Sequence, residues 1–358
     1  MTVLLTITIL ILTGIAIWQI TKIFELSQIG LKKDNSQIAT EKDNDLNGKL
    51  MFGFLVFIYI VTIYCFWAYT KVLLPESASE HGEIYDTLLW VSFAIILFAQ
   101  TLTQAVLHWF AYKYRGINNR KAYFFTHDNK LELVWTVIPA IIFFVLIIYG
   151  MITWGQIMNF NEDDEDDLVI ELYAQQWNWK ARYGGEDNVL GDANVRFLND
   201  FDGKNAVGID SSDPNGMDDF VVTQEFHLPV NRKVIFKMRS QDVLHSAYMP
   251  HFRAQMNCVP GMITEFSFTP TITSEEMRQN SDVVAKVNRI NKIRYDKSQK
   301  LISKGEEALD SYQFDYLLLC AKICGTSHYN MQMKIVVESE KDYNKWKAQQ
   351  QTFSEIIQ

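Results

Sequence analysis

The stretch Cys320-Ala-Lys-Ile-Cys324-Gly-Thr-Ser-His328-Tyr-Asn-Met331 decides how this chain is interpreted. It contains two thiols, one imidazole and one thioether, which suit copper better than magnesium, calcium or manganese. A mononuclear blue-copper site needs one thiolate, two imidazoles and a weak axial thioether, so Cys320 exceeds that requirement. Because two thiolates four residues apart can bridge two metals, the additional cysteine favours a binuclear copper centre.

A second imidazole must come from elsewhere in the chain. His245 in Gln-Asp-Val-Leu-His-Ser is the best candidate because it follows a strand-like run, Lys233-Val-Ile-Phe-Lys-Met-Arg. Each part also has a simpler explanation. Cys-x3-Cys could form a disulfide or half of a zinc site, and a lone histidine after a strand is more often a surface or hydrogen-bonded residue. The combination of all these ligand types favours copper over those alternatives.

These residues resemble the ligand pattern of the cytochrome c oxidase subunit II family, which carries the dinuclear copper centre CuA. The family pattern is Val-Leu-His-Ser followed by Cys-x-Glu-x-Cys-Gly-x-x-His-x-x-Met. The resemblance implies that two copper ions are held by His245, Cys320, the backbone carbonyl of Lys322, Cys324, His328 and Met331. Lys322 replaces the family glutamate, whose side chain binds magnesium. We therefore expect the copper site to persist, and the magnesium site to be lost, reorganised or replaced by the lysine ammonium standing where the cation would be.

The resemblance extends to three further residues. Trp177 in Trp-Asn-Trp matches the tryptophan through which electrons enter in the family, although aromatic strand residues mostly fill cores. Glu132 lies three residues before Trp135-Thr136, where the family has the entrance of a proton channel into subunit I. An acid at a helix N-terminus also has an ordinary electrostatic explanation. Asp242, close to His245, is a candidate for docking an electron donor.

Composition and charge restrict the partners. A net charge of −9 and a pI near 5.3 exclude a general nucleic-acid binder and suit a basic protein partner. The acidic run Asn161-Glu-Asp-Asp-Glu-Asp-Asp167 is interpreted as a solvated linker, or as a patch that steers a basic donor. No Cys-x-x-Cys-His occurs, so we expect no haem in this chain.

Four apolar segments, roughly 3–20, 51–69, 88–110 and 133–154, are each near the length of about 20 residues that crosses a bilayer. The linker between the third and fourth segments is rich in Lys and Arg, whereas the linker between the second and third has none. The first and third linkers are then cytoplasmic, which places the copper domain in the periplasm. The first segment could be a cleaved signal peptide, but it lacks preceding basic residues, so we expect an uncleaved helix.

Beyond residue 168 the apolar pattern alternates, as in β-strands. Runs near 233–239, 263–268, 314–319 and 333–337 predict further strands, and Lys180 and Arg182 are expected on a polar face. The pattern permits a β-sandwich, and the resemblance implies a cupredoxin fold.

The expected fold class is therefore four transmembrane helices followed by an all-β cupredoxin sandwich with a helical insertion. Residues 1–75 are expected to hold two additional helices with a cytoplasmic linker, and residues 76–158 the helical hairpin of the family. The periplasmic copper domain is expected over 159–345, with the insertion near 272–311, and a C-terminal tail over 346–358.

The resemblance implies subunit II of a bacterial inner-membrane oxidase that passes electrons from soluble or tethered cytochrome c to haem in subunit I. Oxygen reduction and proton pumping then follow in the complex. Expected partners are subunits I and III, cytochrome c and membrane lipid, with a larger respiratory supercomplex as an option. Three alternatives make different demands on the sequence. A quinol oxidase subunit would lack the ligands, a blue-copper carrier would not need Cys320, and a scaffold with a vestigial site would bind no metal.

Overall fold

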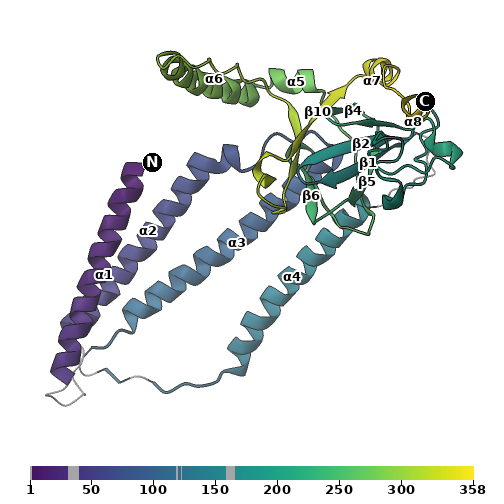
Figure 1. The fold of residues 1–358 in the computed structure, drawn as a ribbon. Helices are drawn as coiled ribbons and strands as arrows, with labels where there is room; N and C mark the ends of the chain where they lie inside the picture. Colours follow the sequence, from purple (N-terminus) through teal and green to yellow (C-terminus); the bar gives the residue numbers. More distant parts are fainter. Residues whose placement is uncertain (1, 31–39, 118–119, 122, 159–165) are drawn as a thin grey trace. The chain divides into compact units, whose positions relative to one another are not determined.

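Four long apolar helices form the first part of the chain (Figure 1). The structure, a computed structural model, describes residues 2–30, 40–117, 120–121, 123–158 and 166–358. The helices are α1 (Thr2–Gly30), α2 (Glu41–Leu73), α3 (Glu80–Lys113) and α4 (Asn129–Ile157), and each is long and apolar enough to cross a membrane. The four predicted apolar helices are confirmed. The chain divides into two compact units, Met1–Thr70 with Ala94–Glu132, and Lys71–Phe93 with Leu133–Gln358.

Within the first unit, α2 packs along α3. Gly48 of α2 lies against Tyr112 of α3, whose ring would be 2.9 Å from a Cβ at position 48. Phe52 meets the Tyr112 ring edge-on, with ring centroids 5.1 Å apart. Further along, the Tyr59 hydroxyl donates to the Thr101 carbonyl at 3.1 Å. The additional helix α2 therefore has a defined partner inside the chain itself.

The second unit contains a β-sandwich of two five-stranded sheets, ordered β3-β2-β1-β5-β8 and β4-β10-β9-β6-β7. The strands are β1 (Leu168–Gln175), β2 (Asn178–Tyr183), β3 (Phe220–Val222), β4 (Glu225–Pro229), β5 (Val234–Ser240), β6 (His245–Met249), β7 (Ala254–Cys258), β8 (Thr264–Phe268), β9 (Tyr316–Cys320) and β10 (Gln332–Glu338). Large apolar side chains such as Trp179, Phe236 and Tyr316 fill the core between the sheets. The strands predicted near 233–239, 263–268, 314–319 and 333–337 are confirmed as β5, β8, β9 and β10.

One expectation about β2 is wrong. The strand pattern places Arg182 on a polar face, but its side chain is buried and forms ion pairs with Glu171 at 2.9 Å and Asp219 at 3.4 Å. Its guanidinium also donates to the Gly191 carbonyl at 2.8 Å. The segment that follows β2 therefore covers this face of the sheet, which a strand pattern alone does not reveal.

The helical insertion is confirmed as α5 (Ser274–Gln279) and α6 (Ser281–Ile302). Asn280 caps the start of α6, and Asn291 exchanges two hydrogen bonds with the backbone of Tyr312 on the returning segment. The residues expected as a tail carry the end of α7 (Glu340–Lys347) and all of α8 (Phe353–Ile357). Phe353 is buried, and its backbone N–H donates to the Asp219 carbonyl. This end of the chain therefore packs on the sandwich.

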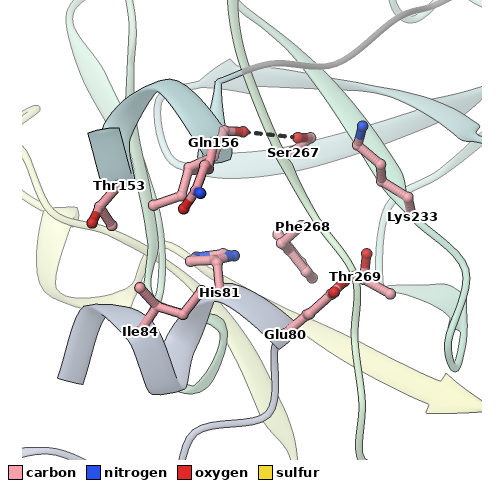
Figure 2. Close-up of a pocket in the computed structure, with 10 residues that line it drawn as sticks. Glu80, His81, Ile84, Thr153, Gln156, Lys233, Ser267, Phe268 and Thr269 are labelled. Atoms are coloured by element: carbon pink, nitrogen blue, oxygen red, sulfur yellow. Dashed lines mark hydrogen bonds between the residues drawn. The ribbon is translucent and has the colours of Figure 1, made fainter. Parts of the chain in front are cut away.

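The segment before α3 joins the sandwich directly. Ala78 is fully buried, and its N–H donates to the His251 carbonyl at 2.7 Å. Arg253 forms a bidentate pair with Asp86 of α3, with both N···O distances 2.7 Å. A cavity of about 360 Å³ lies where α3 begins, α4 ends and β8 forms the sheet edge (Figure 2). At the end of α4 the Ser267 hydroxyl donates to the Ile157 carbonyl at 3.2 Å. These hydrogen bonds hold the start of α3 and the end of α4 beside the sandwich.

Candidate metal centre

Two neighbouring strands of the second sheet position the predicted ligands. His245 begins β6 and Cys320 ends β9, and the register between these strands pairs Ala247 with Cys320. Both ligands therefore lie at the same end of the sandwich. The loop after Cys320 is closed by the N–H of that residue, which donates to the Met331 carbonyl at 3.1 Å. The first and last predicted ligands of the loop, Cys320 and Met331, are therefore adjacent in the fold.

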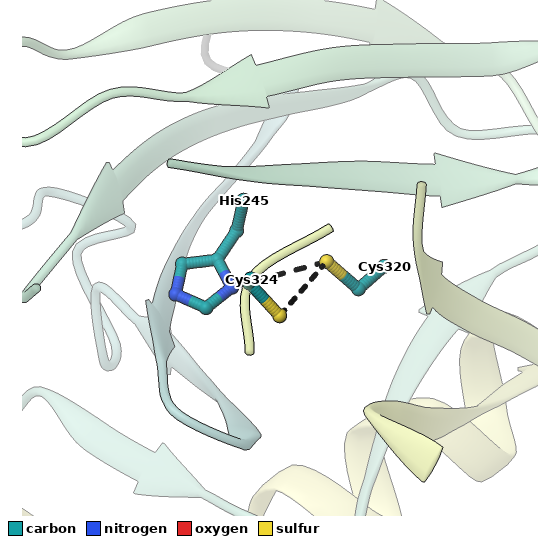
Figure 3. Close-up of side chains that lie close together, drawn as sticks. All are labelled: His245, Cys320 and Cys324. Carbon is teal, nitrogen blue, oxygen red and sulfur yellow. Dashed lines mark hydrogen bonds between the residues drawn. The ribbon is translucent and has the colours of Figure 1, made fainter. Parts of the chain in front are cut away.

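The first half of the centre consists of one imidazole and two thiols (Figure 3). The Cys320 Sγ lies 3.8 Å from His245 Nδ1 and 3.7 Å from Cys324 Sγ. All three ligand atoms lie within 4.8 Å of one another. His245 is fully buried and Cys324 is nearly so. The fold therefore brings together His245 and Cys320, which are 75 positions apart in the sequence.

The second half of the centre gathers around Cys324. Its Sγ lies 3.6 Å from His328 Nδ1 and 3.8 Å from Met331 Sδ. The Lys322 carbonyl oxygen lies 3.2 Å from Cys320 Sγ, while the Lys322 side chain belongs to an exposed residue. The structure thus brings together every metal ligand that the sequence predicted. These include the backbone carbonyl of Lys322, which is present whatever side chain stands at this position.

The donor set suits copper. It comprises two thiolates, two imidazole Nδ1 atoms, one thioether and one carbonyl, which is the mixture of soft and borderline ligands that favours copper. The separation of 3.7 Å between the sulfurs leaves the cysteines as free thiols, far from the roughly 2.05 Å of a disulfide bond. Two sulfurs so placed, each with its own imidazole, can serve two metal ions.

Burial affects the thiol at the middle of the cluster. It raises the pKa of Cys324 from 9.0 to about 11, and the neighbouring Cys320 thiol acts in the same direction. Because copper binds the thiolate, this site must lose a proton when it is loaded.

Asp242 makes contacts inside the protein. Its Oδ1 accepts from His245 Nε2 at 2.8 Å, and its Oδ2 accepts from the Gln176 backbone N–H at 2.7 Å. Burial opposes ionisation, but hydrogen bonds from Gln176, His245 and Val243 outweigh it, so the pKa of Asp242 is lowered. A carboxylate on the far nitrogen fixes the orientation of a ligand imidazole. Docking of a donor by Asp242 stays a prediction.

Trp177 lies beside the copper loop. Its side chain is 39% exposed, and a Cβ on Gly325 would lie 3.0 Å from its indole Cζ2 and Nε1 atoms. Gly325 has φ +131°, a conformation that favours glycine. The residue before the tryptophan, Gln176, donates from Nε2 to the Cys324 carbonyl at 2.7 Å. Sequence reasoning missed Gln176, and its position next to Trp177 was the only signal.

The remaining predicted residues lie elsewhere. Glu132 is in the first turn of α4, and one of its carboxylate oxygens lies 3.7 Å from Nδ1 of the exposed His127. Asp128 caps this helix by accepting from the N–H groups of Lys130 and Leu131. Most of the acidic run before the sandwich, residues 161–165, lies outside the described residues.

Two family descriptions match the chain. Residues 70–152 match "Cytochrome C oxidase subunit II, transmembrane domain", and residues 168–289 match "Cytochrome C oxidase subunit II, periplasmic domain". The first match begins near the end of α2, so α1 and most of α2 lie outside it. The second match ends before the loop that carries Cys320 to Met331. That loop is therefore assigned by its motif and its geometry.

Individual proteins are similar over most of their length. The alternative cytochrome c oxidase subunit 2 of Bradyrhizobium diazoefficiens is 30% identical over 289 residues, which cover 80% of this chain and 86% of that protein. The probable cytochrome c oxidase subunit 2 of Rickettsia bellii is 24% identical, covering 75% of this chain and 78% of that protein. Among solved structures, the periplasmic domain of cytochrome oxidase subunit II (CoxB) of Bradyrhizobium japonicum is 17% identical, with a TM-score of 0.29, covering 51% of this chain and 91% of that one. A TM-score this low adds nothing to the assignment.

Proposed function

The chain belongs to the cytochrome c oxidase subunit II family, and from this premise we propose that it receives electrons at a dinuclear CuA centre and passes them to haem in subunit I. As subunit II of an oxidase it is anchored in the membrane, carries a periplasmic domain and works together with other oxidase subunits. In the proposed role, copper supplies one-electron redox chemistry. The protein supplies a rigid and largely buried set of ligands.

The observation that carries the proposal is the convergence of all predicted donor atoms at one end of the sandwich. Two sulfurs 3.7 Å apart lie between two imidazoles and a thioether. Cys320 and Cys324 would hold both copper ions, and copper would supply one-electron redox chemistry whose charge the two sulfurs would help to spread. A carrier with one copper would not require Cys320 at this place.

The surface above the copper loop supports electron transfer through Trp177. This side chain is partly exposed and lies against Gly325, the residue after Cys324. If a cytochrome c docked on Trp177, only the indole ring of this residue would separate it from the ligand loop at Gly325. Docking that also uses Asp242 is part of the proposal, as is steering by the acidic run before the sandwich.

The proposal includes a bacterial inner-membrane location, subunits I and III and cytochrome c as partners, with membership of a larger respiratory supercomplex left open. Proton uptake through Glu132 also belongs to it. Glu132 lies at the start of α4, and ionisable groups at a membrane edge often serve proton relays.

The magnesium site of the family is proposed to be absent or reorganised. Lys322 keeps its backbone carbonyl beside Cys320, but it offers a cationic side chain where the family has a carboxylate. An ammonium group cannot ligate magnesium, which takes oxygen ligands. Metal analysis of the assembled oxidase should find no tightly bound stoichiometric magnesium or manganese beside this residue. Finding either metal there would contradict this part of the proposal.

The test is copper content together with electron paramagnetic resonance of the full-length chain, purified in detergent and loaded with copper. Two coppers per chain that share one unpaired electron are expected. One copper with a blue-copper spectrum would instead make the protein a carrier-type site with Cys320 idle. Absence of copper binding would leave a degenerate subunit.

A further inference from the structure

One residue connects the two ligand-bearing segments of the copper centre. The backbone N–H of Gln176 donates to Asp242 Oδ2 at 2.7 Å, and Asp242 Oδ1 accepts from His245 Nε2 at 2.8 Å. The side-chain Nε2 of the same Gln176 donates to the Cys324 carbonyl at 2.7 Å. The turn between β1 and β2 therefore contacts the His245 segment with its main chain and the Cys324 loop with its side chain.

We propose that Gln176 is a positioning residue of the copper centre, which holds the Cys324 loop in register with His245. This inference rests on the proposed function, since it concerns the same centre. Gln176 offers no ligand itself and acts through the residues that it touches. Its importance comes from linking segments that are 66 and 148 positions away in the sequence.

The hydrogen bond from Gln176 reaches the residue whose sulfur joins Cys320 to the last two predicted ligands of the loop. Cys324 Sγ lies 3.7 Å from Cys320 Sγ and also contacts a ligand atom of His328 and of Met331. A hydrogen bond to the Cys324 carbonyl fixes the peptide plane that joins it to Gly325. Gly325, with φ +131°, has wide conformational freedom. Without the Gln176 bond, this flexible peptide would be held mainly by the ligands themselves.

The same residue connects the copper loop to the proposed site of electron transfer. Gln176 immediately precedes Trp177, and both side chains would lie 3.0 Å from a Cβ at position 325. One short turn therefore fixes the tryptophan and the ligand loop against each other. Removal of the amide is expected to loosen both the metal geometry and the contact with the indole ring.

The experiment compares three full-length variants with the natural protein in detergent. Gln176→Leu removes the amide at nearly constant volume, and Gln176→Glu replaces the donor with a carboxylate that faces the Cys324 carbonyl. Gln175→Leu is the matched control, because Gln175 is the adjacent glutamine and makes no hydrogen bond to a ligand segment among the described residues. Copper retention against a competing chelator, the resonance spectrum and thermal unfolding of the copper-free protein are measured.

Both Gln176 variants are expected to bind copper with about tenfold lower affinity. Loss of a hydrogen bond to a metal-binding residue typically lowers metal affinity by about 10- to 100-fold, and a single bond is expected at the lower end of this range. Their spectra should be heterogeneous, while the copper-free proteins unfold at the same temperature as the natural chain. Gln175→Leu should match the natural protein throughout. Retention and spectra unchanged in both Gln176 variants would overturn the positioning role while leaving the proposed function intact. A natural protein that binds fewer than two coppers would overturn the proposed function and this inference together.

Discussion

At the scale of single residues, the role of Cys320 separates a binuclear centre from a mononuclear one. Its sulfur lies within 3.8 Å of both His245 Nδ1 and Cys324 Sγ, so it can serve two metals. Cys324, His328 and Met331 together with His245 would supply the ligands of a mononuclear site without Cys320. The thiol of Cys320 is thus the atom whose removal should change the number of coppers.

The substitution Cys320→Ser should reduce the copper content from two to one per chain and abolish the shared-electron spectrum. A serine hydroxyl is a harder and weaker ligand for copper than a thiolate, so it should not retain the second ion in place of the thiolate. Metal analysis and resonance spectroscopy check this. Cys65→Ser, at an exposed cysteine of α2, is the matched control and should retain both coppers. Two coppers in Cys320→Ser would show that the thiol is not a bridge.

Copper loading should depend on pH through Cys324. Burial raises the pKa of this thiol to about 11, so the copper-free protein holds the proton at neutral pH. Binding releases that proton, and the apparent copper affinity should therefore rise about tenfold per pH unit for this proton alone, up to pH near 11. Titrations with a competing chelator at several pH values, and proton release in weak buffer, measure the effect. An affinity independent of pH between about 6 and 8 would contradict it.

At the scale of elements, α2 is the feature that distinguishes this chain from the matched transmembrane domain. Close packing against α3 depends on the absence of a side chain at Gly48, because a Cβ at this position would lie 2.9 Å from the Tyr112 ring. Small residues at helix interfaces allow such approach in membranes. The polar end of the same interface carries the ion pair of Asp45 with Arg115 at 2.8 Å. Both apolar packing and an ion pair therefore hold α2 against α3.

The substitution Gly48→Leu should destabilise the α2–α3 contact by about 1–3 kcal/mol, the usual cost of overpacking. Thermal unfolding in detergent measures the loss, and the copper spectrum should not change because the sandwich is a separate unit. Gly53→Leu is the matched control on the same helix, since a Cβ there has no neighbour within 4 Å. Equal stability of both variants would show that α2 does not depend on this close approach.

At the scale of the whole molecule, the copper centre and Glu132 belong to different compact units of the chain. The proposed electron transfer and the proposed proton uptake can therefore be tested by separate substitutions. Glu132 lies in the first turn of α4, while every copper ligand lies in the sandwich.

The substitution Glu132→Gln should slow turnover of the assembled oxidase when proton uptake limits the rate, and it should leave copper reduction unchanged. Removing the charge removes the proposed proton acceptor at the membrane edge. Steady-state oxygen consumption and rapid-mixing reduction of copper separate the two steps. Glu83→Gln, an acid in the first turn of α3, is the control. Unchanged turnover in Glu132→Gln would remove the proton role.

Much of this molecule could be predicted from the sequence because the relevant signals are local. Continuous apolar runs predict the four helices, alternation predicts β5, β8, β9 and β10, and the ligand types between Cys320 and Met331 predict copper. Contacts between distant segments could not be predicted in this way. Arg182 was misplaced because alternation does not show that a later loop covers the outer face of β2, and Gln176 was missed because its amide meets Cys324 only in the folded chain.

The sequence by itself determined the long apolar helices, the strands and the set of proposed metal ligands, since each depends on residue type and short-range spacing. Only the tertiary structure decided that His245 meets Cys320, that Asp242 orients the histidine and that α2 packs on α3. These contacts arise from strand register and helix packing, which bring together side chains that are far apart in the chain. The physical reason is that each depends on the shape of a distant segment, and no local pattern encodes that shape.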